Sequence, residues 1–265
     1  MALEKTLALA LKSYDWSESS RTISFFTRNF GKLSLVDKGG RSLTSKRGRV
    51  VPYSELELTF YESKKESSGY ISDVELIRMF ELSGEGSLGR LAYASATVEL
   101  LQLLLPKEEP LIDLYEYSVS LLEKIDQAKK QALASLFLTF FLRLLSQLGY
   151  HPSLGYCGGC DRSLESFIKE GAAVRFSPER GGVVCPSCQN PGEYYIGLPY
   201  GSFTKLEELQ TASLNEAEKL TLGFKETSLL LDALVKFLEY QADISQKIKS
   251  LEFLQKLKNT KFMTE

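Results

Sequence analysis

The clearest fold signal in this chain of 265 residues is the stretch RTISFFTRNFGKLSLVDKGG, residues 21–40. It holds two short runs of β-forming residues, 23–26 (ISFF) and 33–36 (LSLV). Turn-forming residues separate them at 29–31, and two glycines follow at 39–40. Short apolar runs bounded by Gly and Asn are typical of neighbouring β-strands. The stretch therefore predicts a strand, a tight turn and a second strand.

The same signal recurs on both sides of this stretch. Leu7, Leu9 and Leu11 alternate before it, residues 56–61 (LELTFY) alternate after it, and residues 70–74 form a last short run. Closing a sheet on itself removes its exposed edges, so five short strands in about eighty residues favour a small closed barrel.

The apolar period changes after the segment LSGEGSLG at residues 82–89. Between residues 133 and 148 the apolar side chains recur at helical spacing, and Gly149 follows as a helix cap. Ser213 and Glu216 have the spacing of a capping box. Further helices are predicted at 88–105, 111–125, 229–238 and 248–257. The predicted fold class is α+β, with a barrel domain at 1–81 and a helical domain at 82–265, interrupted at about 154–198 by the cysteines.

All four cysteines lie in two matched CxxC pairs, Cys157 with Cys160 and Cys185 with Cys188. Two such turns supply the four tetrahedral sulfur ligands that Zn²⁺ prefers. A β-hairpin at about 173–184 would bring the pairs together. These residues predict one structural zinc ion in the module at 154–198.

Three other interpretations of the cysteines stay open: a redox pair, a catalytic zinc and four thiols without a structural role. A catalytic zinc normally keeps one position open, and zinc deaminases carry a ligand-x-Glu element that is missing here. A zinc-dependent hydrolase would need a general base, and Glu165 and Glu170 are the nearby carboxylates.

Other catalytic signatures are also missing. The one histidine, His151, precedes a proline and is expected to be a capping or surface residue. GxxxxGK[ST] does not occur, and the one GxGxxG match, at residues 84–89, lies in the segment interpreted as a linker, so no nucleotide cofactor is expected. The sequence predicts a protein that is not an enzyme.

Composition excludes few function classes. The formal net charge is −2, and 43% of the residues are hydrophobic. The apolar run at 133–145 is too short to span a bilayer and contains Arg143. No secretory signal is recognised at the N-terminus, so the expected compartment is the cytoplasm, where cysteines bind metal more often than they form disulfides.

Basic residues are concentrated in the predicted barrel. Between residues 21 and 50 eight cations face the single acid Asp37, so this segment carries +7, and the cations are Arg21, Arg28, Lys32, Lys38, Arg41, Lys46, Arg47 and Arg49. A solvated strand face is the alternative. The loop at 38–49 suits a phosphate backbone, because backbone contacts supply most of the sequence-independent affinity for nucleic acid. Phe25, Phe26 and Phe30 are expected to pack in the core more than to stack on bases.

Three motifs resemble the RecO family of bacterial DNA repair proteins. They are T-x-x-x-G-K at Thr27 to Lys32, K-G-x-R at Lys38 to Arg41, and L-x-L-x-x-Y at Leu56 to Tyr61. The later LLSQLGYHPSLGYCGGC at 144–160 is similar to the junction between helix and cysteine module in that family. The resemblance covers essentially the whole chain, although the last sixty residues add little. Some family members lack the cysteines.

The resemblance implies an OB-fold in the barrel and a recombination mediator as the function. Such proteins bind single- and double-stranded DNA, anneal complementary strands, and act with RecR to load RecA onto strands coated by the protein SSB. They also capture the acidic, apolar C-terminal tail of SSB in the helical domain, where the surroundings of Arg143 or Lys236 would suit it in general terms. The expected location is the cytoplasm, with nucleoid association during repair.

The residues expected to contact DNA are Arg28, Lys32, Lys38, Arg41, Lys46, Arg47 and Arg49. The leading alternative is a helical protein-interaction scaffold whose basic surface is incidental.

Overall fold

The computed structural model describes residues 2–15, 17–40, 50–62, 69–84, 86–168, 173–244 and 248–258. Contacts between residues divide the chain into two compact units, Met1–Gln127 and Ala128–Glu265. Each unit is described by itself.

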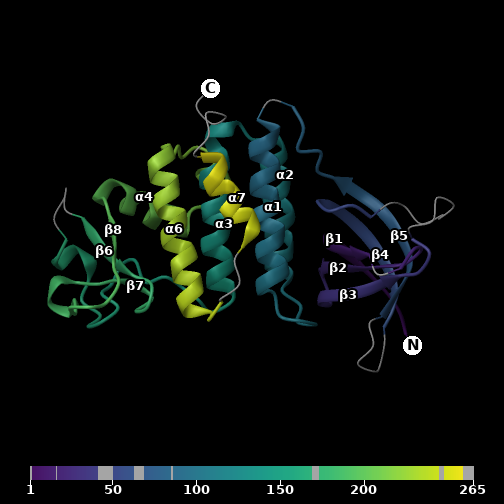
Figure 1. The fold of residues 1–265 in the computed structure, drawn as a ribbon, viewed down its shortest axis with the longest axis horizontal. Coiled ribbons are helices and arrows are strands. Elements are labelled where there is room, and N and C mark those ends of the chain that lie inside the picture. Colours follow the sequence, from purple (N-terminus) through teal and green to yellow (C-terminus); the bar gives the residue numbers. More distant parts are fainter. Residues whose placement is uncertain are drawn as a thin grey trace. The chain divides into compact units, whose positions relative to one another are not determined.

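The first unit begins with a closed five-stranded barrel, as predicted. Its strands are β1 (Leu3–Asp15), β2 (Arg21–Thr27), β3 (Gly31–Asp37), β4 (Ser54–Tyr61) and β5 (Gly69–Met79). The order around the barrel is β1-β2-β3-β5-β4, and β1 closes it by pairing with both β2 and β4 (Figure 1). Only the β3–β5 pair is parallel among these strand pairs. The architecture is that of an OB-fold, and the α+β class is confirmed.

Successive residues of β1 and β2 point alternately into the barrel and away from it, and residues of both kinds are buried. Phe25 belongs to the core inside the barrel, together with Ala8 and Ala10. Phe26 instead packs edge-on against Tyr115 of α2, with ring centroids 5.5 Å apart. Leu9 pairs with Phe26 across the strands and is also buried. The alternating leucines of β1 thus identify a strand, but alanines supply its contribution to the barrel core.

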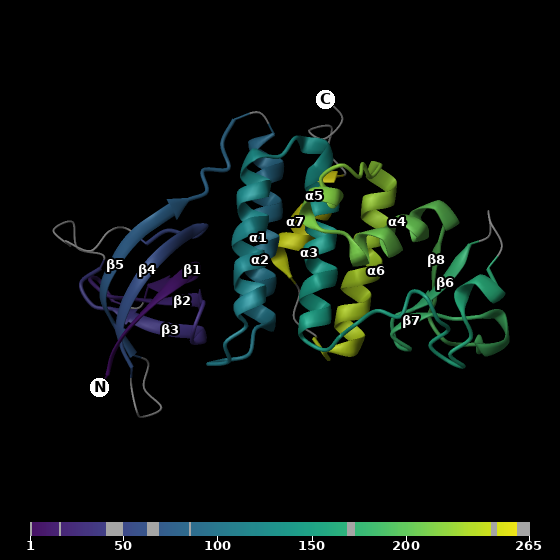
Figure 2. The same ribbon diagram turned by 180° about the vertical axis from the view of Figure 1, so that it is seen from behind.

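Two helices complete the first unit. They are α1 (Ser87–Leu104) and α2 (Ile112–Gln127), which run side by side and match the helices predicted at 88–105 and 111–125 (Figures 1 and 2). Tyr115 of α2 is fully buried and donates a hydrogen bond of 3.1 Å to the carboxylate of Glu55 on β4. The hydroxyls of Tyr53 and Ser95 make a second link of 2.8 Å between barrel and helices.

The second unit is built around α3 (Leu133–Gln147). Its other helices are α4 (Tyr200–Thr211), the single turn α5 (Leu214–Ala217), α6 (Phe224–Gln241) and α7 (Lys249–Lys258). Helix α3 contacts α4, α5 and α6 and is buried over nearly its whole circumference. It ends as predicted at Gly149, whose φ is +85°. The next amide, of Tyr150, returns a 2.8 Å hydrogen bond to the carbonyl of Leu145, which completes a Schellman motif.

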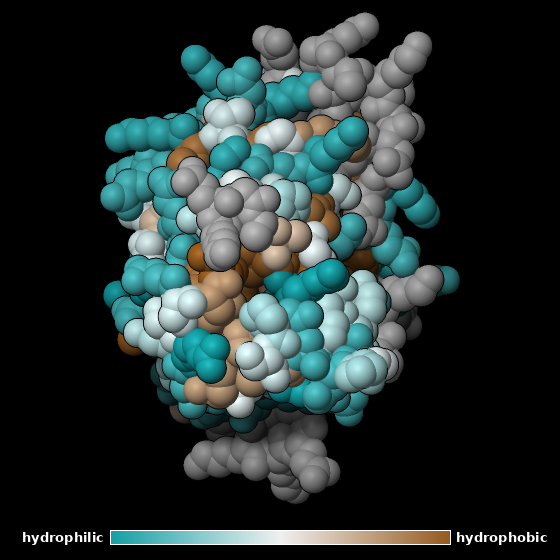
Figure 3. Space-filling view, turned by 90° about the vertical axis from the view of Figure 1, so that its left-hand side faces the viewer, coloured by the Kyte–Doolittle hydropathy of each residue, from teal (hydrophilic) through white to brown (hydrophobic). Residues whose placement is uncertain are grey.

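The cysteine module lies between α3 and α4 in the sequence. It contains a three-stranded sheet of order β7-β6-β8, formed by β6 (Val174–Ser177), β7 (Gly182–Val183) and β8 (Ile196–Leu198). The hairpin predicted at 173–184 is β6–β7, whereas β8 and α4 were not predicted. Short 3-10 turns lie at Lys130–Ala132, Leu164–Ser166 and Pro186–Cys188. Figure 3 shows a face with apolar residues along its middle and hydrophilic residues around them.

No helix among the described residues is both long enough and apolar enough to cross a membrane.

Candidate metal centre and nucleic-acid interface

The fold brings the four cysteines together. The sulfur atoms of Cys157, Cys160, Cys185 and Cys188 all lie within 4.8 Å of one another. Cys157 and Cys185 are buried, whereas Cys160 is exposed. This arrangement can hold a metal ion, as the spacing predicted.

The hairpin β6–β7 positions the first CxxC loop. The amide of Gly158 donates 2.8 Å to the carbonyl of Val183 on β7, and the amide of Cys157 donates 2.8 Å to the carbonyl of Arg162. The loop contains glycines because other chain segments lie close: a Cβ at Gly158 would lie only 2.8 Å from the carbonyl oxygen of Arg180. The loop backbone therefore packs directly on the turn between β6 and β7.

Backbone amides point at the Cys157 sulfur. The amide of Cys185 donates to it over 3.2 Å and that of Gly159 over 3.4 Å. Burial opposes ionisation of this thiol, but the amides of Cys185, Gly159 and Cys160 outweigh it and lower the pKa of Cys157 to about 6. Hydrogen bonds with Cys160 and Cys185 and burial raise the pKa of the Cys188 thiol to about 12. The protein alone therefore favours the thiolate of Cys157 and the thiol of Cys188.

The donor set fits a zinc ion. Four sulfurs complete the tetrahedral shell of structural Zn²⁺, and N–H···S hydrogen bonds stabilise the thiolates that zinc requires. Among the other candidates, His151 is exposed and contacts Ser146 Oγ over 3.2 Å through Nδ1. Glu165 is exposed, and Glu170 lies outside the described residues.

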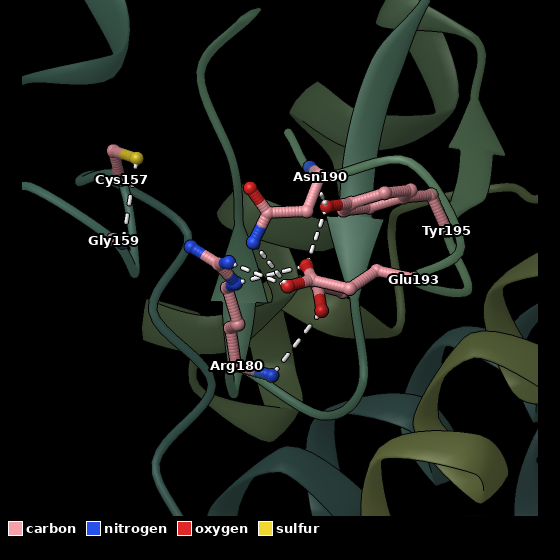
Figure 4. A network of polar contacts seen from close by, with 7 residues as sticks. Cys157, Gly159, Arg180, Asn190, Glu193 and Tyr195 are labelled. Atoms are coloured by element: carbon pink, nitrogen blue, oxygen red, sulfur yellow. Dashed lines mark hydrogen bonds and ion pairs between the residues drawn. The ribbon is translucent and has the colours of Figure 1, made fainter. Parts of the chain in front are cut away.

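A polar network lies beside the cysteines (Figure 4). Arg180 donates to Glu193 through Nε over 3.0 Å and through Nη2 over 2.6 Å. Glu193 also accepts from Asn190 Nδ2 over 2.7 Å and from the Tyr195 hydroxyl over 2.5 Å. Arg180, Tyr195 and Asn190 together lower the pKa of Glu193 to about 2. Sequence reasoning missed this network, because a polar residue five positions after Cys188 carries no recognisable pattern.

Three of the seven residues predicted to contact DNA lie in the described part of the barrel unit. Arg28 forms an ion pair of 2.5 Å with Glu116 on α2. Lys32 Nζ donates over 2.9 Å to the carbonyl of Gln102, in the last turn of α1. Burial, with a smaller contribution from Lys107, lowers the pKa of Lys32. Arg28 and Lys32 therefore link the barrel to its helices.

The remaining predicted DNA contacts begin at Lys38. Lys38 is exposed, and its Nζ lies 4.0 Å from the centroid of the Tyr70 ring. Arg41, Lys46, Arg47 and Arg49 lie outside the described residues.

The T-x-x-x-G-K motif forms a turn that docks on the connection between α1 and α2. Thr27 Oγ1 donates over 2.7 Å to the carbonyl of Gly31 and accepts from the amide of Phe30 over 3.1 Å. Gly31 has φ of +66°, and a Cβ there would overlap the backbone of Glu109. The motif therefore has a clear structural role in this chain.

Arg143 and Lys236 are the two basic residues whose surroundings were expected to suit an acidic tail. Arg143 is exposed on α3, the helix with the wide apolar surface. Lys236 forms an ion pair of 2.6 Å with Glu239 and lines a cavity of about 420 Å³ between β8, α6 and α7. Asp232 and Glu252 line the same cavity, so three carboxylates face one lysine. An acidic partner is disfavoured at Lys236.

Comparison with known proteins identifies the family. The model of the N-terminal part of recombination protein O matches residues 1–80, and that of its C-terminal part matches residues 85–252. The DNA repair protein RecO of Symbiobacterium thermophilum is 27% identical over 98% of this chain and 100% of its own length. The RecO proteins of Chlorobium phaeobacteroides and Chlorobium limicola are 26% and 28% identical over 96% and 93% of this chain, and over 98% and 95% of their own lengths. The chain therefore belongs to the RecO family of DNA repair proteins.

Proposed function

We propose that this chain is a recombination mediator without enzymatic activity. It binds single- and double-stranded DNA, anneals complementary strands, and acts with RecR to load RecA onto single strands coated by SSB. The observation that carries the proposal is the closed OB-fold barrel at the N-terminus of a RecO family chain, with its excess of basic residues between 21 and 50. The protein works in the cytoplasm and associates with the nucleoid during repair.

Annealing without ATP is the central test of this function. Purified protein should speed the pairing of complementary labelled strands when no nucleotide is present, because the sequence carries no P-loop motif GxxxxGK[ST]. Turnover of ATP, or a rate equal to that of DNA alone, would contradict the proposal.

DNA binding is proposed to occur through Arg28, Lys32 and the loop that carries Lys38, Arg41, Lys46, Arg47 and Arg49. Each phosphate contact to a single strand contributes about −0.7 to the slope of log K against log salt. Replacing Lys46, Arg47 and Arg49 together by Ala should weaken binding to all sequences and flatten that slope by about 2.

A matched triple variant controls for net charge. Lys219, Lys225 and Lys249 are exposed in the second unit, and their joint replacement by Ala removes the same three charges. This control should keep the wild-type slope. If both triple variants behave alike, or if the loop variant keeps the wild-type slope, the loop is a solvated surface and the protein-interaction scaffold becomes the better interpretation.

One Zn²⁺ per chain is proposed at Cys157, Cys160, Cys185 and Cys188. Its role is structural, because four thiolates close the coordination shell. Elemental analysis of protein purified without chelators should give one zinc per chain, and protein free of zinc would contradict the proposal.

The acidic, apolar SSB tail is proposed to bind the helical domain on the side of Arg143. Arg143→Glu should weaken binding of a labelled peptide with that tail chemistry, because it turns attraction into repulsion. Lys236→Glu is the control, since that position is already surrounded by carboxylates. Equal loss in both variants, or no loss in either, would show that the tail binds elsewhere.

A further inference from the structure

The turn that carries Arg180 is fixed from two directions. Within the turn, the amide of Arg180 donates to Ser177 Oγ over 3.2 Å. From α6, Gln241 Nε2 donates to the carbonyl of Pro178 over 2.8 Å and to that of Glu179 over 2.9 Å. These contacts hold the Arg180 backbone in place beside the first CxxC loop.

The guanidinium of Arg180 is held equally firmly. Glu193 occupies Nε and Nη2 in a two-pronged contact, and the Glu193 carboxylate is itself fixed by Asn190 and Tyr195. A planar guanidinium held in this way can present its remaining nitrogen in only one direction. The Arg180 and Glu193 side chains are only 24% and 21% exposed, so solvent screens them incompletely.

The remaining nitrogen, Nη1, lies beside a metal-ligand candidate. A Cβ at Gly159 would lie 2.8 Å from Arg180 Nη1 and 3.2 Å from Cys188 Sγ. Both atoms therefore border the same small space, and the absence of a side chain at Gly159 lets them approach. Figure 4 shows Arg180 between the Glu193 carboxylate and the loop that carries Gly159.

We propose that Arg180 is the electrostatic partner of the four-cysteine site, a fixed cation that slows the loss of its metal. The proposal rests on the proposed zinc site. Four thiolates around Zn²⁺ leave a net charge of about −2 on the cluster. A fixed cation beside this negative cluster is attracted to it, and the attraction stabilises the metal-loaded site. Arginine remains charged throughout this chemistry, and Glu193 holds it in position.

Four full-length variants separate charge from packing. Arg180→Gln removes the cation, and Arg180→Lys keeps the charge without the two-pronged contact. Glu193→Gln disturbs the network but keeps the cation. Arg175→Gln removes an exposed cation from β6 of the same hairpin and serves as the matched control. Zinc content is measured first, followed by the rate of zinc release to a chromogenic chelator and by the pH at which half the zinc is lost.

We expect one zinc per chain in every variant as purified. Release from Arg180→Gln should be about 10–100-fold faster than from wild type, the range typical when a group supporting metal ligands is removed. Its pH of half-release should rise, whereas Arg175→Gln should match wild type. Arg180→Lys should fall between wild type and Arg180→Gln, and Glu193→Gln should change release far less than Arg180→Gln does.

Each contrary result has a distinct meaning. Zinc absent from the wild-type protein would refute the zinc site itself. Zinc present with equal release from Arg180→Gln and Arg175→Gln would overturn the role of Arg180. Equal acceleration in Arg180→Gln and Glu193→Gln, with no change in the pH of half-release, would show that Arg180 only packs the loop. If Arg180→Gln does not fold, as judged by circular dichroism, the rates of zinc release from Arg180→Lys and Glu193→Gln still decide. Faster release from Arg180→Lys than from Glu193→Gln supports the proposal, and equal or slower release from Arg180→Lys overturns it.

Discussion

Gly31 shows how one residue of the T-x-x-x-G-K motif controls the docking of the barrel on its helices. It has φ of +66°, and a side chain would overlap the backbone of Glu109. Gly31→Ala should lower the free energy of unfolding by about 3 kcal/mol, because strained backbone and overpacking add. Gly39→Ala is the matched control, since Gly39 has φ of +73° with nothing within 4 Å. Gly39→Ala should lower the free energy of unfolding by about 1 kcal/mol. If urea denaturation gives the same loss of unfolding free energy for both variants, the close approach of Gly31 to Glu109 does not contribute to stability.

Glu193 gives the cysteine module a defined dependence on pH. Arg180, Tyr195 and Asn190 lower the pKa of Glu193 from 4.5 to about 2. Because the folded pKa is the lower one, the network stabilises the module at every pH above 4.5, and this contribution is lost as the pH falls toward 2. In ¹³C NMR, the Glu193 carboxyl should therefore stay ionised between about pH 7 and pH 4, while in Arg180→Gln it should begin to protonate. A Glu193 signal that titrates alike in both proteins would contradict this assignment.

At the scale of elements, the periodicity of apolar residues predicted most helices and strands. It did not predict which face of a strand lines the barrel core and which face packs against the helices. The apolar run at 133–148 predicted α3, and alternation predicted β1, because these patterns are local. That Leu9 and Phe26 pack outside the barrel depends on α1 and α2, which lie far along the chain. Such contacts between distant segments cannot be read from the spacing of residues.

Helix α4 escaped prediction for a local reason. Its buried residues are only Phe203, Leu206 and Leu209, one in each three positions, and the rest of the helix is polar. Gly201 in its first turn weakens the helical signal further. The cysteine site was predictable because CxxC is a local spacing that suits metal ligands. The Arg180–Glu193 network instead depends on the fold of the module, which brings Arg180 of the β6–β7 turn to Glu193.

Removing the proposed zinc ion should unfold the cysteine module, while the barrel unit should stay folded. Cys185→Ser removes one ligand, and structural zinc contributes roughly 10–16 kcal/mol of apparent binding free energy in small modules. We expect loss of zinc and faster amide exchange confined to about residues 154–198. Ser187→Ala changes an exposed residue inside the same CxxC loop and should leave both properties unchanged. Retained zinc in Cys185→Ser, or unfolding that extends to the barrel, would contradict this expectation.

At the scale of the whole molecule, a chain of net charge −2 keeps eight basic residues against one acid between residues 21 and 50. Arg21, Arg28 and Lys32 are used inside the barrel unit: Arg21 pairs with Asp37 over 3.0 Å, Arg28 with Glu116, and Lys32 with the end of α1. The five others are Lys38, Arg41, Lys46, Arg47 and Arg49. Arg28 and Lys32 therefore have structural contacts of their own in addition to their proposed role in DNA binding.

The two-unit division gives the last prediction, which concerns where the chain can be cut. The sequence predicts a boundary at 81/82, whereas contacts divide the structure at 127/128. A fragment of residues 1–81 would expose Leu9 and Phe26, which are buried outside the barrel, and would lose the Tyr115–Glu55 hydrogen bond. Exposing each large apolar side chain costs about 1.5–3 kcal/mol, a large share of the 5–15 kcal/mol that stabilises a typical domain.

We therefore expect fragment 1–127 to unfold cooperatively in urea and fragment 1–81 to be markedly less stable, as followed by circular dichroism. Tyr115→Phe in the longer fragment is the control for the polar link alone. Tyr115→Phe should lower the free energy of unfolding of this fragment by about 1.5–3 kcal/mol, because the hydroxyl that it removes donates to a carboxylate. If fragment 1–81 is as stable as fragment 1–127, the helices α1 and α2 contribute nothing to the barrel, and the boundary at 81/82 is the physical one.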